Sequence, residues 1–147
     1  MIQPHHDGSE LYVSNSAPTL GERVTLKVRV PKNDPANSLF VRIIQDGEAV
    51  TYPMKKSKRT SVETWWQVSV EIVSTLTNYR FLLRNQRDFR WLNAEGVFAR
   101  DVVDHCDFKL VAHREAPTWL RKSVFYQIFP DRFARSSIKR ELPEWAI

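Results

Sequence analysis

Five residues between positions 101 and 107 are of types that bind metals or act as nucleophiles. They are Asp101, Asp104, His105, Cys106 and Asp107. Their spacing matches neither a zinc motif such as C-x2-C nor a twelve-residue calcium loop. Cys106 has no base or oxyanion partner that the sequence identifies, and four glycines in the whole chain could hardly supply a phosphate-binding loop. We therefore expect a charged loop that leads into a strand at 107–112, with no catalytic residue and no metal site.

Two tryptophans are the candidate binding residues. Residues 64–73 alternate with a period of two, which places Trp65 on the polar face of a strand. An indole on a polar face is apolar surface that needs a partner, either a ligand or the surface of another domain or subunit. Trp91 lies in a turn-rich segment, where it is either a ligand contact or a lid over the core.

The elements that position these residues are predicted to be short β-strands. Residues 23–30 alternate strictly, with Val24, Leu26, Val28 and Val30 on one face. In 64–73 the inner face holds Trp66, Val68, Val70 and Ile72, and in 78–84 it holds Tyr79, Phe81 and Leu83. The other predicted strands are 39–44, 10–14, 89–92, 96–100 and 108–112.

The segments between the strands carry turn signals and no helical pattern. Asp46-Gly47 predicts a hairpin turn after 39–44, and the basic segment 55–59 (KKSKR) is predicted to be a solvated hairpin tip. His5–Asp7 is interpreted as an unstructured or strand-entry segment. No helical periodicity persists over three turns before residue 113. The fold class predicted is therefore all-β, an immunoglobulin-like antiparallel β-sandwich.

Composition limits the size and class of the protein. The chain has 147 residues, of which 42% are hydrophobic and 27% charged, as is typical of a soluble globular protein with one core. A complete (β/α)8 barrel needs about 250 residues. There is no apolar run of membrane-spanning length and no secretory signal, and the single cysteine suits a reducing compartment, so we expect a cytoplasmic protein. The net charge is +5, but the only basic cluster is 55–59, so nucleic acid is not an expected partner.

The end of the chain has a different character. Residues 124–129 (VFYQIF) form a near-continuous apolar run, typical of a strand inside a parallel sheet. The remaining 18 residues contain no second such strand. We therefore predict a sandwich at 1–112, a connector at 113–122, and at 123–147 the truncated start of a barrel. A strand without its neighbours is expected to pack against the sandwich or a second copy, or to be mobile.

The stretch VFYQIFPDRFARS at 124–136 resembles the first barrel strand and following loop of the α-amylase superfamily of glycoside hydrolases. The resemblance is closest to the neopullulanase, cyclomaltodextrinase and maltogenic amylase branch, in which a carbohydrate-binding-type β-sandwich precedes the barrel. HDGSELYVSN at 6–15, NYRFLLR at 78–84 and WLNAEGV at 91–97 fit that sandwich. The residues of the barrel-strand motif in this chain are Tyr126, Gln127, Pro130, Asp131, Arg132 and Phe133.

The resemblance implies a parent enzyme that hydrolyses maltooligosaccharides, cyclodextrins or pullulan. It implies that the sandwich shapes the active-site cleft, often across a homodimer, and holds glucan, for which Trp65 and Trp91 are the candidate contacts. The implied partners are α-glucan oligosaccharides, the catalytic barrel and a second copy of the chain. Retaining hydrolysis needs two carboxyl groups about 5–5.5 Å apart, and the family's catalytic carboxylates lie beyond Ile147, so residues 1–147 are expected to be non-catalytic.

A calcium site and two other classes of function were weighed against this interpretation. Many relatives follow the PDRF motif with an Asn-Gly-Asp loop that helps to build a calcium site, but residues 134–137 here are Ala-Arg-Ser-Ser, so no cofactor is expected. One other class is a stand-alone glycan-binding module. The other is an immunoglobulin-like domain for protein interaction or dimerisation, in which Trp65→Ala would change the oligomer mass and leave sugar titrations flat.

Overall fold

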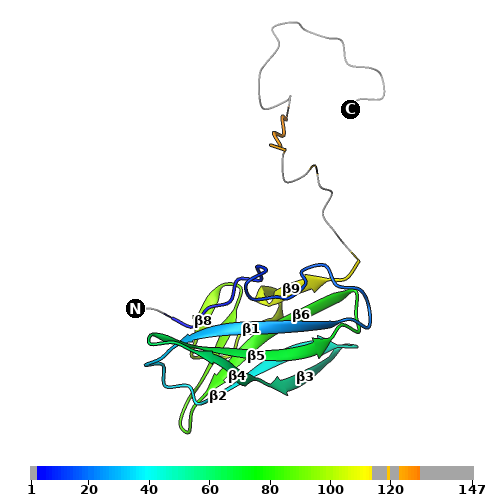
Figure 1. The fold of residues 1–147 in the computed structure, drawn as a ribbon. Helices are drawn as coiled ribbons and strands as arrows, with labels where there is room; N and C mark the ends of the chain where they lie inside the picture. The colour runs from blue at the N-terminus through cyan, green and yellow to red at the C-terminus, as the bar shows by residue number, and fades with distance from the viewer. Residues whose placement is uncertain (1–2, 114–118, 120–122, 130–147) are drawn as a thin grey trace, which may run out of the picture. The chain divides into compact units, whose positions relative to one another are not determined.

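The computed structural model describes residues 3–113, 119 and 123–129. Within these residues the chain forms nine β-strands, one short 3₁₀ helix and no α-helix (Figure 1). The strands are β1 (Arg23–Pro31), β2 (Ser38–Gln45), β3 (Glu48–Pro53), β4 (Lys55–Arg59), β5 (Glu63–Glu71), β6 (Leu76–Arg84), β7 (Phe89–Asn93), β8 (Gly96–Phe98) and β9 (Phe108–Val111). The 3₁₀ helix η1 is Asp104–Cys106.

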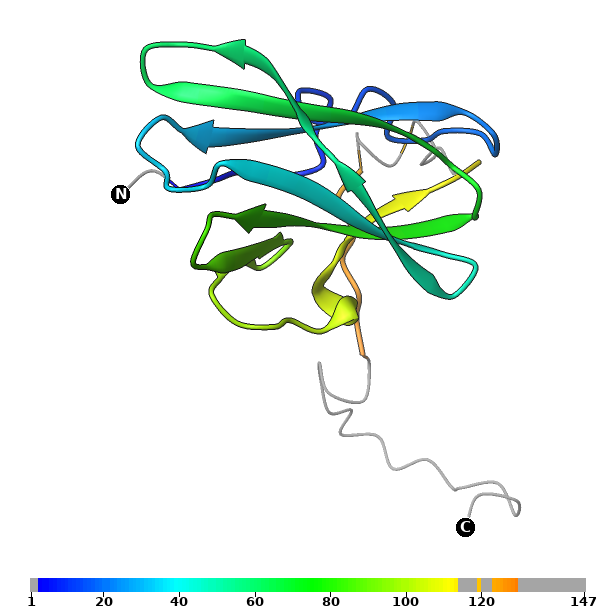
Figure 2. The same cartoon turned by 90° about the horizontal axis from the view of Figure 1, so that it is seen from below.

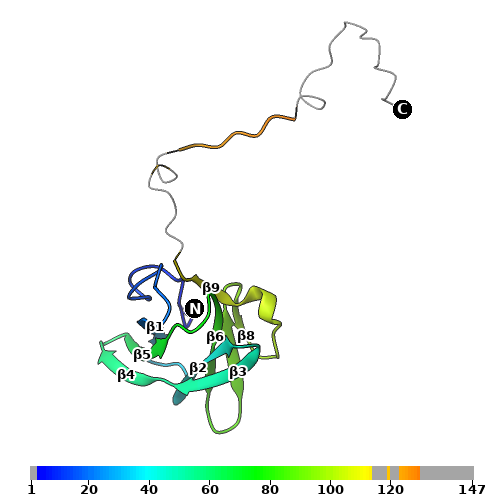
Figure 3. The ribbon, with the colours of Figure 1, turned by 90° about the vertical axis from the view of Figure 1, so that its right-hand side faces the viewer.

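The strands pair into two antiparallel sheets that enclose a core (Figures 1 and 3). One sheet has the order β1-β5-β4, and the other has the order β3-β2-β6-β7-β8. The strand β6 pairs along one edge with β7 through residues 81–84 and with β9 through residues 76–79. This arrangement confirms the predicted all-β sandwich.

The core is built by the alternation seen in the sequence. In one sheet Val28 of β1 lies opposite Trp66 of β5, and in the other Ile43 of β2 lies opposite Tyr79 of β6. All four side chains are buried. The prediction that Tyr79 belongs to the core is confirmed, whereas Val68, predicted to face inward, is only half-buried.

The turn between β2 and β3 confirms the predicted hairpin. Asp46 and Gly47 both have positive φ, 51° and 84°. Positive φ at both central residues is what a type I′ turn requires, and Asp-Gly is among the pairs that adopt it most readily. Gln45 and Glu48 pair on either side of the turn.

The sequence predicts a hairpin tip at 55–59. In the structure this basic segment is instead the edge strand β4. Met54 is buried and its amide donates to the carbonyl oxygen of Leu39 at 2.9 Å. From this point the chain leaves β3 in one sheet and continues as β4 in the other (Figure 2). All five side chains of β4 are exposed, so no alternation marks the strand in the sequence. Lysines on an exposed edge oppose pairing with a second chain.

The predicted strand at 10–14 is also wrong. The amides of Tyr12 and Val13 both donate to the carbonyl oxygen of Ser9 at 2.8 Å, which curls the segment into a turn. Only Val13 makes an isolated bridge, to Leu26. Tyr12 and Val13 are nevertheless buried, so their apolar character reflects packing and not strand formation.

Residues 116–147 form a separate unit, of which only 119 and 123–129 are described. The strand predicted at 124–129 is not formed in these described residues, and the side chains of Val124, Phe125 and Tyr126 are exposed. A strand of a parallel sheet takes its backbone hydrogen bonds from neighbouring strands, and the described residues of this unit contain no such neighbour.

Candidate functional site

Trp65 lies on the outer face of the β1-β5-β4 sheet, as predicted, but it is half-buried. On either side of it in the sheet lie Arg29 of β1 and Lys58 of β4. Its ring is stacked on Tyr12, with ring centroids 5.3 Å apart and planes at 24°. The indole Nε1 donates to Glu63 Oε1 at 2.8 Å. These contacts fix the orientation of the indole and cover part of its surface.

Trp91 lies on the outer face of the other sheet. Its neighbour Leu92 on β7 points into the core, so Trp91 points away from it. The indole Nε1 donates to Asp101 Oδ1 at 3.3 Å, and the guanidinium of Arg80 lies 4.9 Å from the ring centroid. Because the two tryptophans lie on the outer faces of different sheets, they do not form one continuous binding surface.

His6, predicted to lie in an unstructured or strand-entry segment, is a buried residue of the core. Its Nδ1 donates to the carbonyl oxygen of Lys27 at 2.7 Å, and its Nε2 lies 2.9 Å from the Tyr79 hydroxyl. A carbonyl oxygen only accepts, so Nδ1 carries the proton and Nε2 accepts from Tyr79. Burial lowers the pKa of His6 to about 4 and raises that of Tyr79.

The three aspartates at 101–107 do not come together as a metal site. Asp107, predicted to lie where the charged loop meets the strand at 107–112, is fully buried and receives a hydrogen bond from Arg80 Nη1 at 3.2 Å. Asp104 is exposed and lies 2.9 Å from Arg80 and 3.1 Å from Arg42. Burial raises the pKa of Asp107, against the opposing effect of Arg80 and Arg42.

The N-terminal segment and the β7–β8 turn line a hollow of about 540 Å³. His5, Asp7, Arg29, Asn93 and Glu95 are among its polar lining residues. The walls of this hollow come from segments that lie far apart in the chain, so no sequence pattern predicts it. The bridge between His5 and Arg29 places the N-terminal segment along β1 and gives the hollow one of its walls.

Of the barrel-strand motif, only Tyr126 and Gln127 fall within the described residues, and both side chains are exposed. Pro130, Asp131, Arg132 and Phe133 lie outside the described residues. In the described part of the chain, no helix has the length and apolar character needed to cross a membrane.

Residues 6–112, which hold all nine strands of the sandwich, match the family model described as "Alpha amylase, N-terminal ig-like domain". The chain belongs to this family. The match includes Trp65, Trp91 and the buried His6. It therefore covers the two sheets and the candidate contacts described above.

Members of the α-amylase group are also found among proteins similar in sequence and structure. The chain is 24% identical to a cyclomaltodextrinase from Bacillus sp, over 82% of this chain and 23% of the relative. It is 28% identical to an intracellular maltogenic amylase from Bacillus subtilis, over 84% of this chain and 24% of the relative. A solved cyclomaltodextrinase structure shares the fold, with a TM-score of 0.64 and 20% identity over 87% of this chain and 23% of that chain. The chain spans about a quarter of the length of these curated relatives.

Proposed function

We propose that the chain is the N-terminal module of an α-glucan-hydrolysing enzyme of the α-amylase superfamily. The observation that carries the proposal is the family match over the whole sandwich, residues 6–112. The relatives named cyclomaltodextrinase and maltogenic amylase support maltooligosaccharides, cyclodextrins or pullulan as the substrates of the parent enzyme. Residues 1–112 are about three quarters of the chain, so similarity over 84% of it extends past residue 112. The similarity to this relative is therefore not confined to the sandwich.

The module's proposed role is to shape the active-site cleft and to contact glucan. Its proposed partners are α-glucan oligosaccharides, the catalytic barrel and a second copy of the chain. A cytoplasmic location is supported by the single cysteine and by the relative named as an intracellular enzyme.

Trp65 is the proposed principal glucan contact. A sugar ring stacks on an aromatic face, and a ring whose orientation is already fixed loses little entropy on binding. The stacking of Tyr12 and the hydrogen bond to Glu63 fix Trp65 in this way. Trp91 lies on the other sheet, where Asp101 and Arg80 contact its ring. It is proposed as a second, independent glucan contact.

We expect β-cyclodextrin and maltoheptaose to quench the tryptophan fluorescence of the 147-residue chain saturably. Trp65→Ala should weaken the binding about tenfold, because loss of one stacked ring costs roughly 1.4 kcal/mol. Trp65→Phe retains a smaller ring and should lose less. Cellopentaose, whose linkages are β, is the matched control and should give no saturable change. A flat titration with both α-glucans would contradict glucan binding and leave the shaping of the cleft as the module's role.

The 147-residue chain is expected to have no hydrolase activity of its own. Hydrolysis by this family needs a pair of carboxyl groups across the scissile bond, and the family resemblance places them on later barrel strands. Reducing sugar released from maltoheptaose or pullulan should equal that in buffer, while an α-amylase assayed in parallel confirms that the substrates are cleavable. Release above the buffer level that scales with protein concentration would show this expectation to be wrong.

A further inference from the structure

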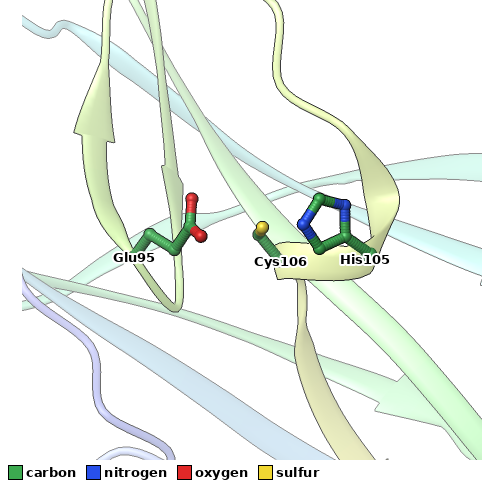
Figure 4. Close-up of side chains that lie close together, drawn as sticks. All are labelled: Glu95, His105 and Cys106. Carbon is green, nitrogen blue, oxygen red and sulfur yellow. The ribbon is translucent and has the colours of Figure 1, made fainter.

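The turn between β7 and β8 and the helix η1 bring three potential metal ligands together. Glu95 lies in the turn, and His105 and Cys106 lie in η1 (Figure 4). One carboxylate oxygen, one imidazole nitrogen and the Cys106 sulfur all lie within 4.8 Å of one another. We propose that Glu95, His105 and Cys106 bind a zinc ion.

The backbone around the three residues is fixed by hydrogen bonds that do not involve the ligand atoms. The Oδ1 of the buried Asn93 accepts from the amides of Glu95 at 3.0 Å and Gly96 at 3.2 Å. The Ala94 amide donates to the carbonyl oxygen of Cys106 at 3.0 Å, which ties the turn directly to η1. The side chains that would bind the ion therefore project from two backbone segments already held side by side, as a preorganised site requires.

The chemistry of the three donors favours zinc over the hard cations. Calcium and magnesium prefer oxygen ligands, whereas a thiolate, an imidazole and a carboxylate are the ligand types that zinc binds. In a tetrahedral zinc site, ligand atoms at the usual bond lengths lie about 3.3–3.6 Å from one another. The three ligand atoms lie within 4.8 Å of one another, so the proposed site requires the exposed Glu95 and His105 side chains to move closer to the Cys106 sulfur. Three protein ligands leave the fourth position to water.

This site could not be predicted from the sequence, because its third ligand lies ten residues before the other two. His105 and Cys106 alone fit no zinc spacing, and Glu95 joins them only through the pairing of the turn with η1. A nucleophilic role for Cys106 is less well supported, because the side chain is buried and a nucleophile must reach its substrate. A zinc ion in this position would bind the turn and η1 to one another.

The test is titration of the reduced 147-residue chain with Zn²⁺ by calorimetry and with Co²⁺ by absorption. We expect one ion per chain, a higher midpoint of thermal unfolding with zinc, and a cobalt spectrum with a near-ultraviolet thiolate charge-transfer band. Glu95→Gln and His105→Gln should each weaken zinc binding at least tenfold, and Cys106→Ser should abolish the charge-transfer band. The first two changes are at exposed positions, so they remain informative if the buried cysteine variant fails to fold.

His5→Gln is the matched control, because His5 lies 3.6 Å from Asp7 and is an alternative surface site for the ion. This variant should bind zinc as tightly as the unaltered chain. The proposal is overturned if the chain binds no zinc, if Glu95→Gln and His105→Gln leave the affinity unchanged, or if His5→Gln alone abolishes binding.

Discussion

Between pH 7 and pH 4 the 147-residue chain should lose about 3 kcal/mol of its free energy of unfolding through the protonation of His6. The pKa of His6 is lowered by burial from 6.5 to about 4. Above pH 6.5 the imidazole is neutral in both states, and its full contribution to stability is present. Between pH 6.5 and 4 only the unfolded chain takes up the proton, so stability falls as the pH falls. A difference of one unit in pKa corresponds to about 1.4 kcal/mol.

The geometry around His6 explains why the folded state resists protonation. In the neutral ring, Nδ1–H donates to the carbonyl oxygen of Lys27 and Nε2 accepts from the Tyr79 hydroxyl. A proton on Nε2 would turn that acceptor into a donor facing the hydroxyl hydrogen of Tyr79. It would also place a charge beside the aromatic rings of Phe81 and Phe108, whose centroids lie 4.8 and 4.6 Å from that of His6.

Urea denaturation at several pH values between 7 and 4 measures this effect. His6→Gln should lose most of the pH dependence, whatever its stability at pH 7, because the titrating group is absent. His5→Gln removes the neighbouring imidazole and should retain the dependence seen in the unaltered chain. Asp107 is present in all three proteins, so its contribution cancels in the comparison. Equal slopes for His6→Gln and the unaltered chain would place the acid sensitivity elsewhere.

Strands in which buried apolar residues alternate with more exposed ones could be predicted from the sequence. β1 shows four buried valines and leucines at every second position, and the two ends predicted for it differ from the structure by at most one residue. β4 could not be predicted, because all five of its residues are polar and exposed and its place is set by pairing with β5.

The candidate site likewise has features that the sequence predicts and contacts that it does not. Alternation along β5 placed Trp65 on the outer face correctly, but the stacking of Tyr12 on its ring comes from a turn more than fifty residues away. The burial of His6 depends on Lys27 and Tyr79, and the approach of Glu95 to Cys106 depends on a turn meeting a helix. Contacts of this kind have no periodicity, so a single sequence does not show them.

Arg80→Met is expected to destabilise the sandwich by about 3–5 kcal/mol, because it leaves a buried carboxylate without its main partner. The Asp107 side chain has 0% exposure and lies 3.2 Å from Arg80 but 3.8 Å from Arg42. Arg80 also donates to the carbonyl oxygen of Val102 at 3.0 Å. Arg42→Met is the matched control, since Arg42 lies opposite Arg80 on β2 and contacts the same two aspartates. Its shorter contact is to the exposed Asp104, so its loss should cost about 1 kcal/mol or less.

A second substitution separates the cost of the unpaired charge from the loss of packing. Adding Asp107→Leu to Arg80→Met removes the stranded carboxylate, and replacing a buried ion pair by apolar side chains is often neutral or stabilising. The double variant should therefore recover at least half of the stability that Arg80→Met loses in urea denaturation at pH 7. If the double variant recovers none of that stability, the stranded carboxylate is not the main cost, and the hydrogen bond to Val102 and the contact with Trp91 are the larger contributions of Arg80. Recovery would mean that the ion pair is retained for a reason other than stability. Asp107 lies between η1 and β9, so the ion pair would then serve to hold η1 beside the β7–β8 turn.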